Sequence, residues 1–331
     1  MINVIKIHNT KYNTKGNPYS DMKQWGEKRY YSLDYYIKDT FGEKLYKLSL
    51  NGGMNCPNRD GHLGYGGCIF CSSGGSGDFA GDRNLSIKDQ IEAGKALVQK
   101  KHTGSSYIAY FQAYTNTYGP LPYLKQIFTE AISEPDVKVL SIATRPDCLP
   151  EDVLDLLASL NQIKPVWVEL GLQTIHKSSS DFIRRGYELD VFENAVYDLK
   201  KRGISVIVHT ISYLPHETKE MMLETISYLN KLPIDGIKLQ LLHVLKGTDL
   251  ADYYEIHPFH LPDMEEYLEM LGCFISHLRP DIVVHRITGD GPKSLLIAPL
   301  WTANKRIVLN SIQKYFKDSD IWQGKDYLPP I

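Results

Sequence analysis

Cysteine, net charge and long hydrophobic runs are all scarce in this sequence. Five unevenly spaced cysteines in 331 residues exclude the disulfide framework of a small secreted domain. The 37 Lys and Arg against 39 Asp and Glu leave a net charge of -2, so any nucleic-acid contact needs a local basic patch. No apolar run approaches the ~20 residues of a membrane span, and the N-terminus lacks a signal-peptide core. We therefore expect a cytoplasmic protein without membrane association.

What the sequence does contain is an alternation of short strand-like and longer helix-like segments. At ~150 residues per domain the length fits two domains or one large α/β barrel with extensions. Runs rich in Val, Ile and Tyr alternate with amphipathic stretches, which is typical of repeated βα units. The expected strands span residues 45–50, 107–112, 137–143, 166–170, 204–212, 237–242 and 282–286.

Helices are expected between these strands. Ser86 and Asp89 resemble a capping box, after which Ile87, Ile91, Leu97 and Val98 recur near helical spacing. Further apolar stripes follow in residues 124–131, 153–160 and 222–229. Each stripe is expected to pack on a sheet.

Polar residues interrupt several of the expected strands. A strand buried on both faces reads as a continuous aliphatic run, and an unpaired buried polar group costs ~1–3 kcal/mol. A barrel lumen that holds a polar ligand would explain these residues together, whereas each one alone could sit at a solvated strand end. They are Ser141, Glu169, His209, Lys238 and Gln240.

Three of the five cysteines form a cluster. Cys56, Cys68 and Cys71 have the spacing C-x11-C-x2-C in a glycine-rich loop directly after the first expected strand. Thiolates at such spacing suit an iron-sulfur cluster or zinc, and His62 could complete a Cys3His zinc site that only staples the loop. The isolated Cys148 and Cys273 are expected to be small buried hydrophobes.

This cysteine loop and the phrases around it resemble the radical S-adenosylmethionine (SAM) enzymes, in particular the branch of YhcC and YtqA, which is related to Elongator complex protein 3 and to oxygen-independent coproporphyrinogen oxidase. The resemblance covers about residues 45–250, with similar phrases at 285–290 and 298–301. It implies an α/β fold with a partial (β/α)6 TIM-like barrel over 45–250, an N-terminal extension over 1–44 and a C-terminal extension over 251–331.

The resemblance also implies cofactors and a site. Cys56, Cys68 and Cys71 would hold a [4Fe-4S] cluster that cleaves SAM to methionine and a 5'-deoxyadenosyl radical, with electrons from a flavodoxin or ferredoxin type donor. Phe70 would pack near the adenine. The Gly-Gly-Glu that often follows the second strand is absent, and Ala143 stands where a carboxylate is expected. The remaining expected SAM or substrate contacts are Gln112, Thr115, Glu169, Gln173, Arg185 and His209.

The same resemblance implies work on the C5 side chain of a tRNA wobble uridine, from carboxymethylaminomethyl to aminomethyl, before methylation by a separate enzyme. Residues 1–50 hold nine Lys or Arg and five acids, interleaved with Trp25 and several tyrosines. Basic and stacking residues suit RNA, but these aromatics could equally cover the barrel. Two alternatives stay open: a radical SAM enzyme for a small metabolite or porphyrin-like substrate, and a zinc-stapled binding module without catalysis.

Overall fold

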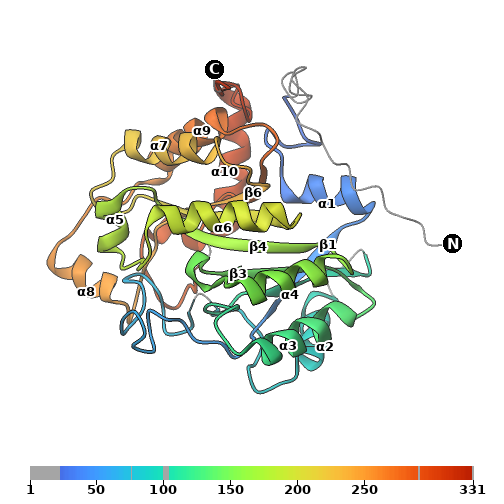
Figure 1. Ribbon diagram of the computed structural model, residues 1–331. Helices are drawn as coiled ribbons and strands as arrows, with labels where there is room; N and C mark the ends of the chain where they lie inside the picture. The colour runs from blue at the N-terminus through green and yellow to red at the C-terminus, as the bar shows by residue number, and fades with distance from the viewer. Residues whose placement is uncertain (1–22, 76, 100–103, 290, 330–331) are drawn as a thin grey trace.

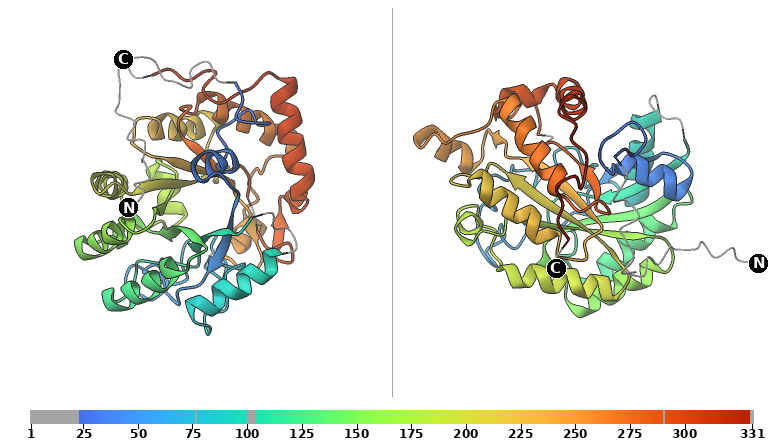
Figure 2. Two further views of the ribbon diagram at one scale, coloured as in Figure 1. Left: turned by 90° about the vertical axis from the view of Figure 1, so that its right-hand side faces the viewer. Right: turned by 90° about the horizontal axis from the view of Figure 1, so that it is seen from above.

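A parallel sheet forms the centre of the computed structural model, which describes residues 23–75, 77–99, 104–289 and 291–329. Seven strands pair in the order β1-β2-β3-β4-β5-β6-β8, and every pairing is parallel. The sheet curls with its helices on the outer side, as a partial barrel (Figures 1 and 2). This confirms the expected α/β partial barrel, and β8 adds a seventh strand to its edge. The strands are β1 Leu45–Leu50, β2 Ser106–Phe111, β3 Val137–Thr144, β4 Val166–Gln173, β5 Ser205–Ser212, β6 Gly236–Leu241 and β8 Val283–Arg286.

Helices connect successive strands, as βα units require. The connecting helices are α2 Ile87–Val98, α3 Leu121–Ser133, α4 Glu151–Asn161, α5 Lys177–Phe182, α6 Leu189–Lys201, α7 Lys219–Leu229, α8 Asp249–Ile256 and α9 Met264–His277. The expected cap of α2 is present, since the Ser86 hydroxyl accepts from the Asp89 amide at 3.1 Å. The expectation for Leu97 is wrong: its side chain is 81% exposed, because it lies six residues after Ile91 and is therefore rotated by about 120° around the helix axis, away from the buried side.

The two faces of the sheet differ in composition. Residues of one parity, such as Leu48, Phe111 and Leu170, face the helices and form the main hydrophobic core. Residues of the other parity face the barrel interior, where parallel strands stack their side chains in layers. The lowest layer, at the amino ends of the strands, is apolar and consists of Leu45, Ile108, Val139, Trp167 and Ile207.

The next layer is polar, and we refer to it as the middle layer. It lies two residues further along each strand and consists of Lys47 on β1, Tyr110 on β2, Ser141 on β3, Glu169 on β4, His209 on β5 and Lys238 on β6. Four of the five polar residues that interrupt the expected strands belong to this layer, so their common position in the barrel interior explains why they are polar. The fifth, Gln240, lies one layer higher in the same direction.

The N-terminal segment closes the amino end of the barrel. Helix α1, Leu33–Phe41, places Ile37 in the apolar lowest layer. The Tyr36 ring packs 6.1 Å from the Trp167 ring, and Trp25 stacks on Tyr31 at 6.1 Å. In the described part of the extension, residues 23–44, these aromatics thus cover the barrel rather than offer open stacking surfaces; residues 1–22 lie outside the described ranges.

C-terminal elements complete the other edge of the barrel. The short strands β7 Val244–Leu245 and β9 Leu296–Ala298 pair antiparallel, and α10, Lys305–Asp318, packs on α9. The short helices η2 Pro146–Cys148 and η3 Leu300–Ala303 turn the chain. Cys148 is buried as expected, whereas Cys273 is exposed because it lies on the solvent side of α9.

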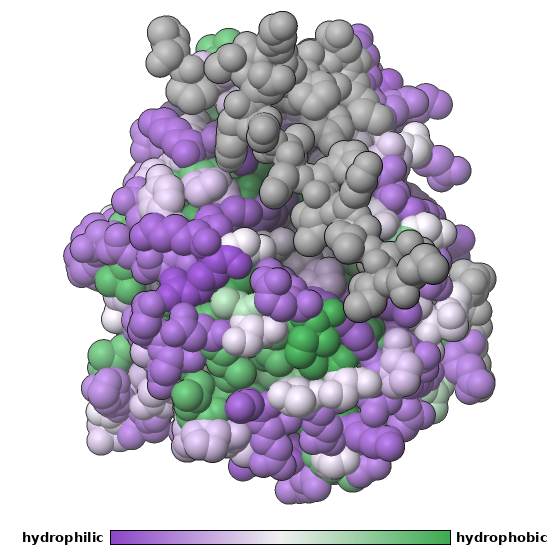
Figure 3. Space-filling model, turned by 45° about the vertical axis from the view of Figure 1, so that its right-hand side comes forward, coloured by the Kyte–Doolittle hydropathy of each residue, from purple (hydrophilic) through white to green (hydrophobic). Residues whose placement is uncertain are grey.

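The outer surface is hydrophilic over most of the face in Figure 3, with one hydrophobic area near the residues drawn in grey. No helix in the described ranges combines the length and apolar character needed to cross a membrane.

Candidate active site

One pocket opens at the carboxyl ends of the strands, where barrel enzymes place their chemistry. Its cavity volume is about 260 Å³. It brings together the three clustered cysteines and the seven expected SAM or substrate contacts, from the cysteine loop, the segment after β2, strands β4 and β5, and the turn after α5. The ten residues are Cys56, Cys68, Phe70, Cys71, Gln112, Thr115, Glu169, Gln173, Arg185 and His209.

The cysteine loop is fixed by its own hydrogen bonds. The Asn58 amide donates to the Arg184 carbonyl at 2.7 Å, which ties the loop to the turn after α5. The Arg59 guanidinium donates to the carbonyls of Cys71 at 3.0 Å and Ser72 at 2.6 Å. Gly67 has φ 87°, a left-handed conformation that favours glycine. These hydrogen bonds therefore fix the backbone from which the cysteine side chains extend.

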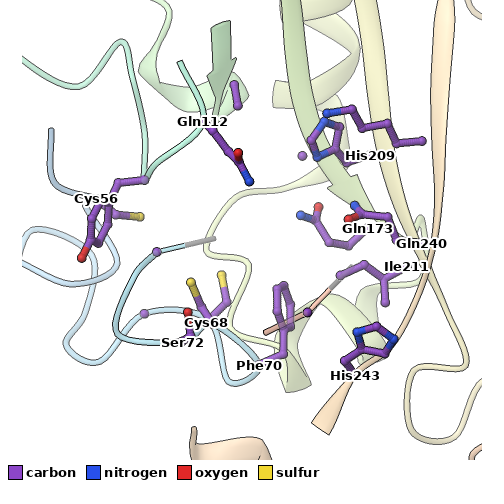
Figure 4. A pocket seen from close by; sticks show the side chains of 18 of the residues that line it. Cys56, Cys68, Phe70, Ser72, Gln112, Gln173, His209, Ile211, Gln240 and His243 are labelled. Atoms are coloured by element: carbon purple, nitrogen blue, oxygen red, sulfur yellow. The ribbon is translucent and has the colours of Figure 1, made fainter. Parts of the chain in front are cut away.

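The three thiols line the same pocket without forming a closed ligand set. Cys56 lies on a different part of the loop from Cys68 and Phe70 (Figure 4). In the part of the chain that the structure describes, no three His, Cys, Asp or Glu side chains stand close enough to ligate one ion. Burial, together with the neighbouring Cys71, raises the pKa of the Cys68 thiol to about 12. A cationic centre bound here would offset that cost, since metal binding requires the thiolate.

His62 does not join these thiols. It is exposed, its ring packs near Tyr118 at 6.4 Å, and it does not line the pocket. The geometry therefore gives no support to a Cys3His zinc site with His62 as fourth ligand.

Polar side chains face the open centre of the pocket. The oxygen Oε1 of Gln173 is buried without a hydrogen-bond partner among the described residues. A Cβ at Gly171 would lie 2.8 Å from the amide nitrogen of Gln173, so glycine leaves room for that side chain. Gln112 also points toward the cavity (Figure 4). An unsatisfied acceptor in a buried site calls for a donor from a ligand, so the pocket fits a polar cofactor such as SAM.

Arg185 has a different environment from the one the sequence suggests. Its side chain is buried, and its guanidinium donates to the carbonyls of Leu172 at 3.1 Å, Thr174 at 2.7 Å and Tyr187 at 3.0 Å. The neighbouring Arg145 forms a two-point pair with Asp147. Arg185 therefore holds the backbone after β4 in place while it lines the pocket.

The floor of the pocket is the middle layer, and Glu169 is its centre. Oε1 accepts from Lys47 Nζ at 3.1 Å and from the Ser141 hydroxyl at 2.9 Å. Oε2 accepts from His209 Nε2 at 2.8 Å and from Lys238 Nζ. A carboxylate offers about four lone-pair positions, so Glu169 has no capacity for a further donor.

The charge states of this layer follow from its geometry. Burial would raise the pKa of Glu169, but Lys238 and Lys47 together outweigh it and hold that pKa well below its usual value. Burial and Lys238 lower the pKa of His209 to about 4, so the imidazole is neutral at pH 7. Because an ionised carboxylate only accepts, Nε2 carries the hydrogen and Nδ1 is left as an acceptor.

Lys238 and Tyr110 complete the layer. Burial, with Lys47 and Arg286 close by, lowers the pKa of Lys238 well below its usual value despite Glu169. Burial and Glu169 raise the pKa of Tyr110 well above its usual value. Lys238 also donates to the Tyr110 hydroxyl at 3.1 Å. The sequence reasoning missed Lys47, Tyr110 and Arg286 as site residues; the shared parity of Lys47 with Leu45 in β1 was the signal that could have found the first of them.

The parallel sheet curls into a partial barrel, a three-cysteine loop follows β1, and a polar pocket lies at the carboxyl ends of the strands. These features define a (β/α) barrel enzyme built around a thiolate-ligated centre. Comparison with known proteins makes the class specific. The family model of the radical SAM superfamily matches residues 55–229, and that of the radical SAM C-terminal domain matches residues 234–318. The chain belongs to the radical SAM superfamily, whose members use a [4Fe-4S] cluster and SAM.

Relatives agree with this assignment. The uncharacterized protein YtqA of Bacillus subtilis is 44% identical over 93% of this chain and 94% of its own length. Protein YhcC of Escherichia coli is 35% identical over 88% of this chain and 94% of its own. The solved structure of Elp3 from the archaeon Methanocaldococcus infernus has a TM-score of 0.64 at 17% identity, over 84% of this chain and 64% of that one, which shows a shared fold. Membership of this superfamily counts against the alternative of a zinc-stapled binding module without catalysis.

Proposed function

We propose that Cys56, Cys68 and Cys71 hold the [4Fe-4S] cluster and that the enzyme modifies the C5 side chain of the wobble uridine of tRNA. When bound, the cluster and SAM supply a 5'-deoxyadenosyl radical that abstracts hydrogen from the substrate. The thiols are the soft ligands that iron-sulfur clusters take, and all three line one pocket. An electron donor of flavodoxin or ferredoxin type completes the proposal.

The other pocket residues are proposed to bind and orient SAM. The buried, unpartnered oxygen of Gln173 accepts from the cofactor, and Gln112 and Thr115 supply further polar contacts from the end of β2. Phe70 offers an apolar face for the adenine. Arg185 and Glu169 are proposed to position the neighbouring pocket residues, since their own polar atoms are hydrogen-bonded within the protein.

The substrate proposal rests chiefly on one similarity. The chain is 27% identical over 161 residues, 48% of its length, to the tRNA uridine(34) acetyltransferase of Methanocaldococcus jannaschii. It is also 23% identical over 58% of its length to human Elongator complex protein 3. The proposed reaction converts carboxymethylaminomethyl to aminomethyl: the methylene carbon of the carboxymethyl group would be oxidised by two electrons, with SAM as the oxidant, and water would release that group as glyoxylate. A separate methyltransferase then acts on the product.

Nucleoside analysis of tRNA tests this proposal directly. Bulk tRNA from a deletion strain should accumulate 5-carboxymethylaminomethyluridine and lose its downstream derivatives. Complementation with the wild-type gene or with Cys273→Ala should restore the profile, because Cys273 is exposed on α9, whereas Cys71→Ala should not. An unchanged wobble-uridine profile in the deletion strain would refute the proposal and favour a small-molecule substrate.

A further inference from the structure

The barrel interior holds more positive than negative charge. Lys47, Lys238 and Arg286 face one carboxylate, Glu169, which already accepts four hydrogen bonds. Within the described residues, Arg286 has no carboxylate or carbonyl partner, although it lines the pocket beside Lys238. His209 adds no further positive charge, because its low pKa keeps it neutral. Lys47 alone offsets the charge of Glu169, so the charge of Arg286 remains without a counter-ion among the described residues.

Lys238 is buried, whereas Lys47 and Arg286 are partly exposed at the pocket, so an anion that enters the pocket would be attracted by all three side chains. Glu169 cannot supply this charge, because its lone pairs are used and its side chain is 0% exposed. When protonated, Lys238 has three donor hydrogens, of which Glu169 and the Tyr110 hydroxyl take two, and an anion that enters beside it favours this protonated form. One lysine donor and the fork of Arg286 thus remain for a ligand, and an arginine fork matches the two oxygens of a carboxylate.

We propose that Arg286 and Lys238 bind a carboxylate carried by the substrate, so that the middle layer is an anion-recognition site below the SAM pocket. This inference rests on the proposed function, since the carboxymethylaminomethyl group of the uridine carries such a carboxylate. The product, an aminomethyl group, carries none. The site therefore distinguishes substrate from product by charge.

Depth separates this site from the cysteine loop. Lys238 precedes Gln240 by two residues, about 7 Å of strand rise, and Gln240 lies in the layer at the strand ends. The cysteines that would hold the cluster lie beyond those ends, on the loop after β1. A short flexible side chain can reach the middle layer from the pocket.

Binding of anticodon stem-loop RNAs to the reconstituted, SAM-loaded enzyme tests the inference. Three stem-loops differ only at the wobble uridine, which carries carboxymethylaminomethyl, its neutral carboxamide or no substituent. Wild-type enzyme should bind the carboxylate form at least tenfold more tightly than the carboxamide. Arg286→Gln should reduce this ratio to near one, Arg286→Lys should retain part of it, and the exposed Arg306→Gln should leave it unchanged.

Each outcome has a distinct meaning. Equal binding of all three stem-loops by the wild type refutes the carboxylate site but leaves the uridine proposal standing. No binding of any stem-loop refutes the proposed function and this inference with it. A preserved ratio in Arg286→Gln refutes the assignment to Arg286. Affinity for SAM, measured separately, should be the same in Arg286→Gln and wild type, and its loss would assign Arg286 to the carboxylate of SAM instead. Circular dichroism confirms that each variant is folded.

Discussion

The buried carboxylate of Glu169 offers the sharpest test of how the barrel interior is held together. Glu169→Gln keeps the shape of the side chain and removes its charge. The amide then has a single oxygen acceptor. Its NH2 group faces two former donors, either Lys47 and Ser141 at the place of Oε1 or His209 and Lys238 at the place of Oε2. Loss of one partner from a buried ion pair costs about 3–5 kcal/mol. We expect a loss of that size in the free energy of unfolding.

Lys238→Met and its combination with Glu169→Gln test how strongly the two side chains stabilise each other. Lys238→Met removes a cation that is already crowded by Lys47 and Arg286, so we expect it to cost less than Glu169→Gln. In the double variant the two losses should not add, and the coupling should be about 0.5–3 kcal/mol, as for residues in one hydrogen-bond network.

Anaerobic urea unfolding, followed by tryptophan fluorescence, measures these differences. A Glu169→Gln protein within about 0.5 kcal/mol of wild type, the scale of an ordinary surface substitution, would refute the reasoning. So would strict additivity in the double variant.

Three further predictions concern single side chains. Unfolded histidine titrates near 6.5 but folded His209 near 4, so the unfolded state binds more protons between these values and stability should fall by up to about 3 kcal/mol as pH drops through them. His209→Asn should make the free energy of unfolding, measured in urea, depend less on pH in this range. If the wild type and His209→Asn lost stability in parallel, the lowered pKa of His209 would be contradicted. Arg185→Met removes the guanidinium that donates to the carbonyls of Leu172, Thr174 and Tyr187. Leu172 keeps the Thr174 amide as a donor, so the cost should come mainly from the other two carbonyls and be about 1–3 kcal/mol; an unchanged midpoint in urea would show that these bonds matter little. Gly186→Ala should cost about 1–2 kcal/mol, because φ is 82° and the added Cβ would lie 2.7 Å from Asn58 Oδ1, and equal thermal midpoints would rule this out.

The sequence predicts the strands and the membership of the pocket well, for physical reasons. Strands buried against helices carry aliphatic runs, so all seven strands of the main sheet were recognised within a few residues. Parity then places Glu169 and Gln173 on the interior face of β4. All ten expected site residues line one pocket because the carboxyl ends of parallel strands meet there. The roles of these ten residues remain predictions.

Pairing within the interior could not be predicted in the same way. Arg185 is expected to contact SAM or substrate, but nothing in its local sequence shows that the carbonyls of Leu172 and Thr174 accept from its guanidinium. Arg286 contributes to the lumen only through the register shift between β6 and β8. Leu97 and Cys273 were misplaced because a helix rotates them away from the side that their neighbours bury.

Formation of 5'-deoxyadenosine by the anaerobically reconstituted protein tests the central claim most directly. With iron, sulfide, SAM and a strong reductant, the wild type should be coloured and should release 5'-deoxyadenosine, as should Cys148→Ala and Cys273→Ala. Alanine at Cys56, Cys68 or Cys71 should abolish release. A colourless wild-type protein that leaves SAM intact would contradict the account, and so would an equal loss of release in Cys148→Ala.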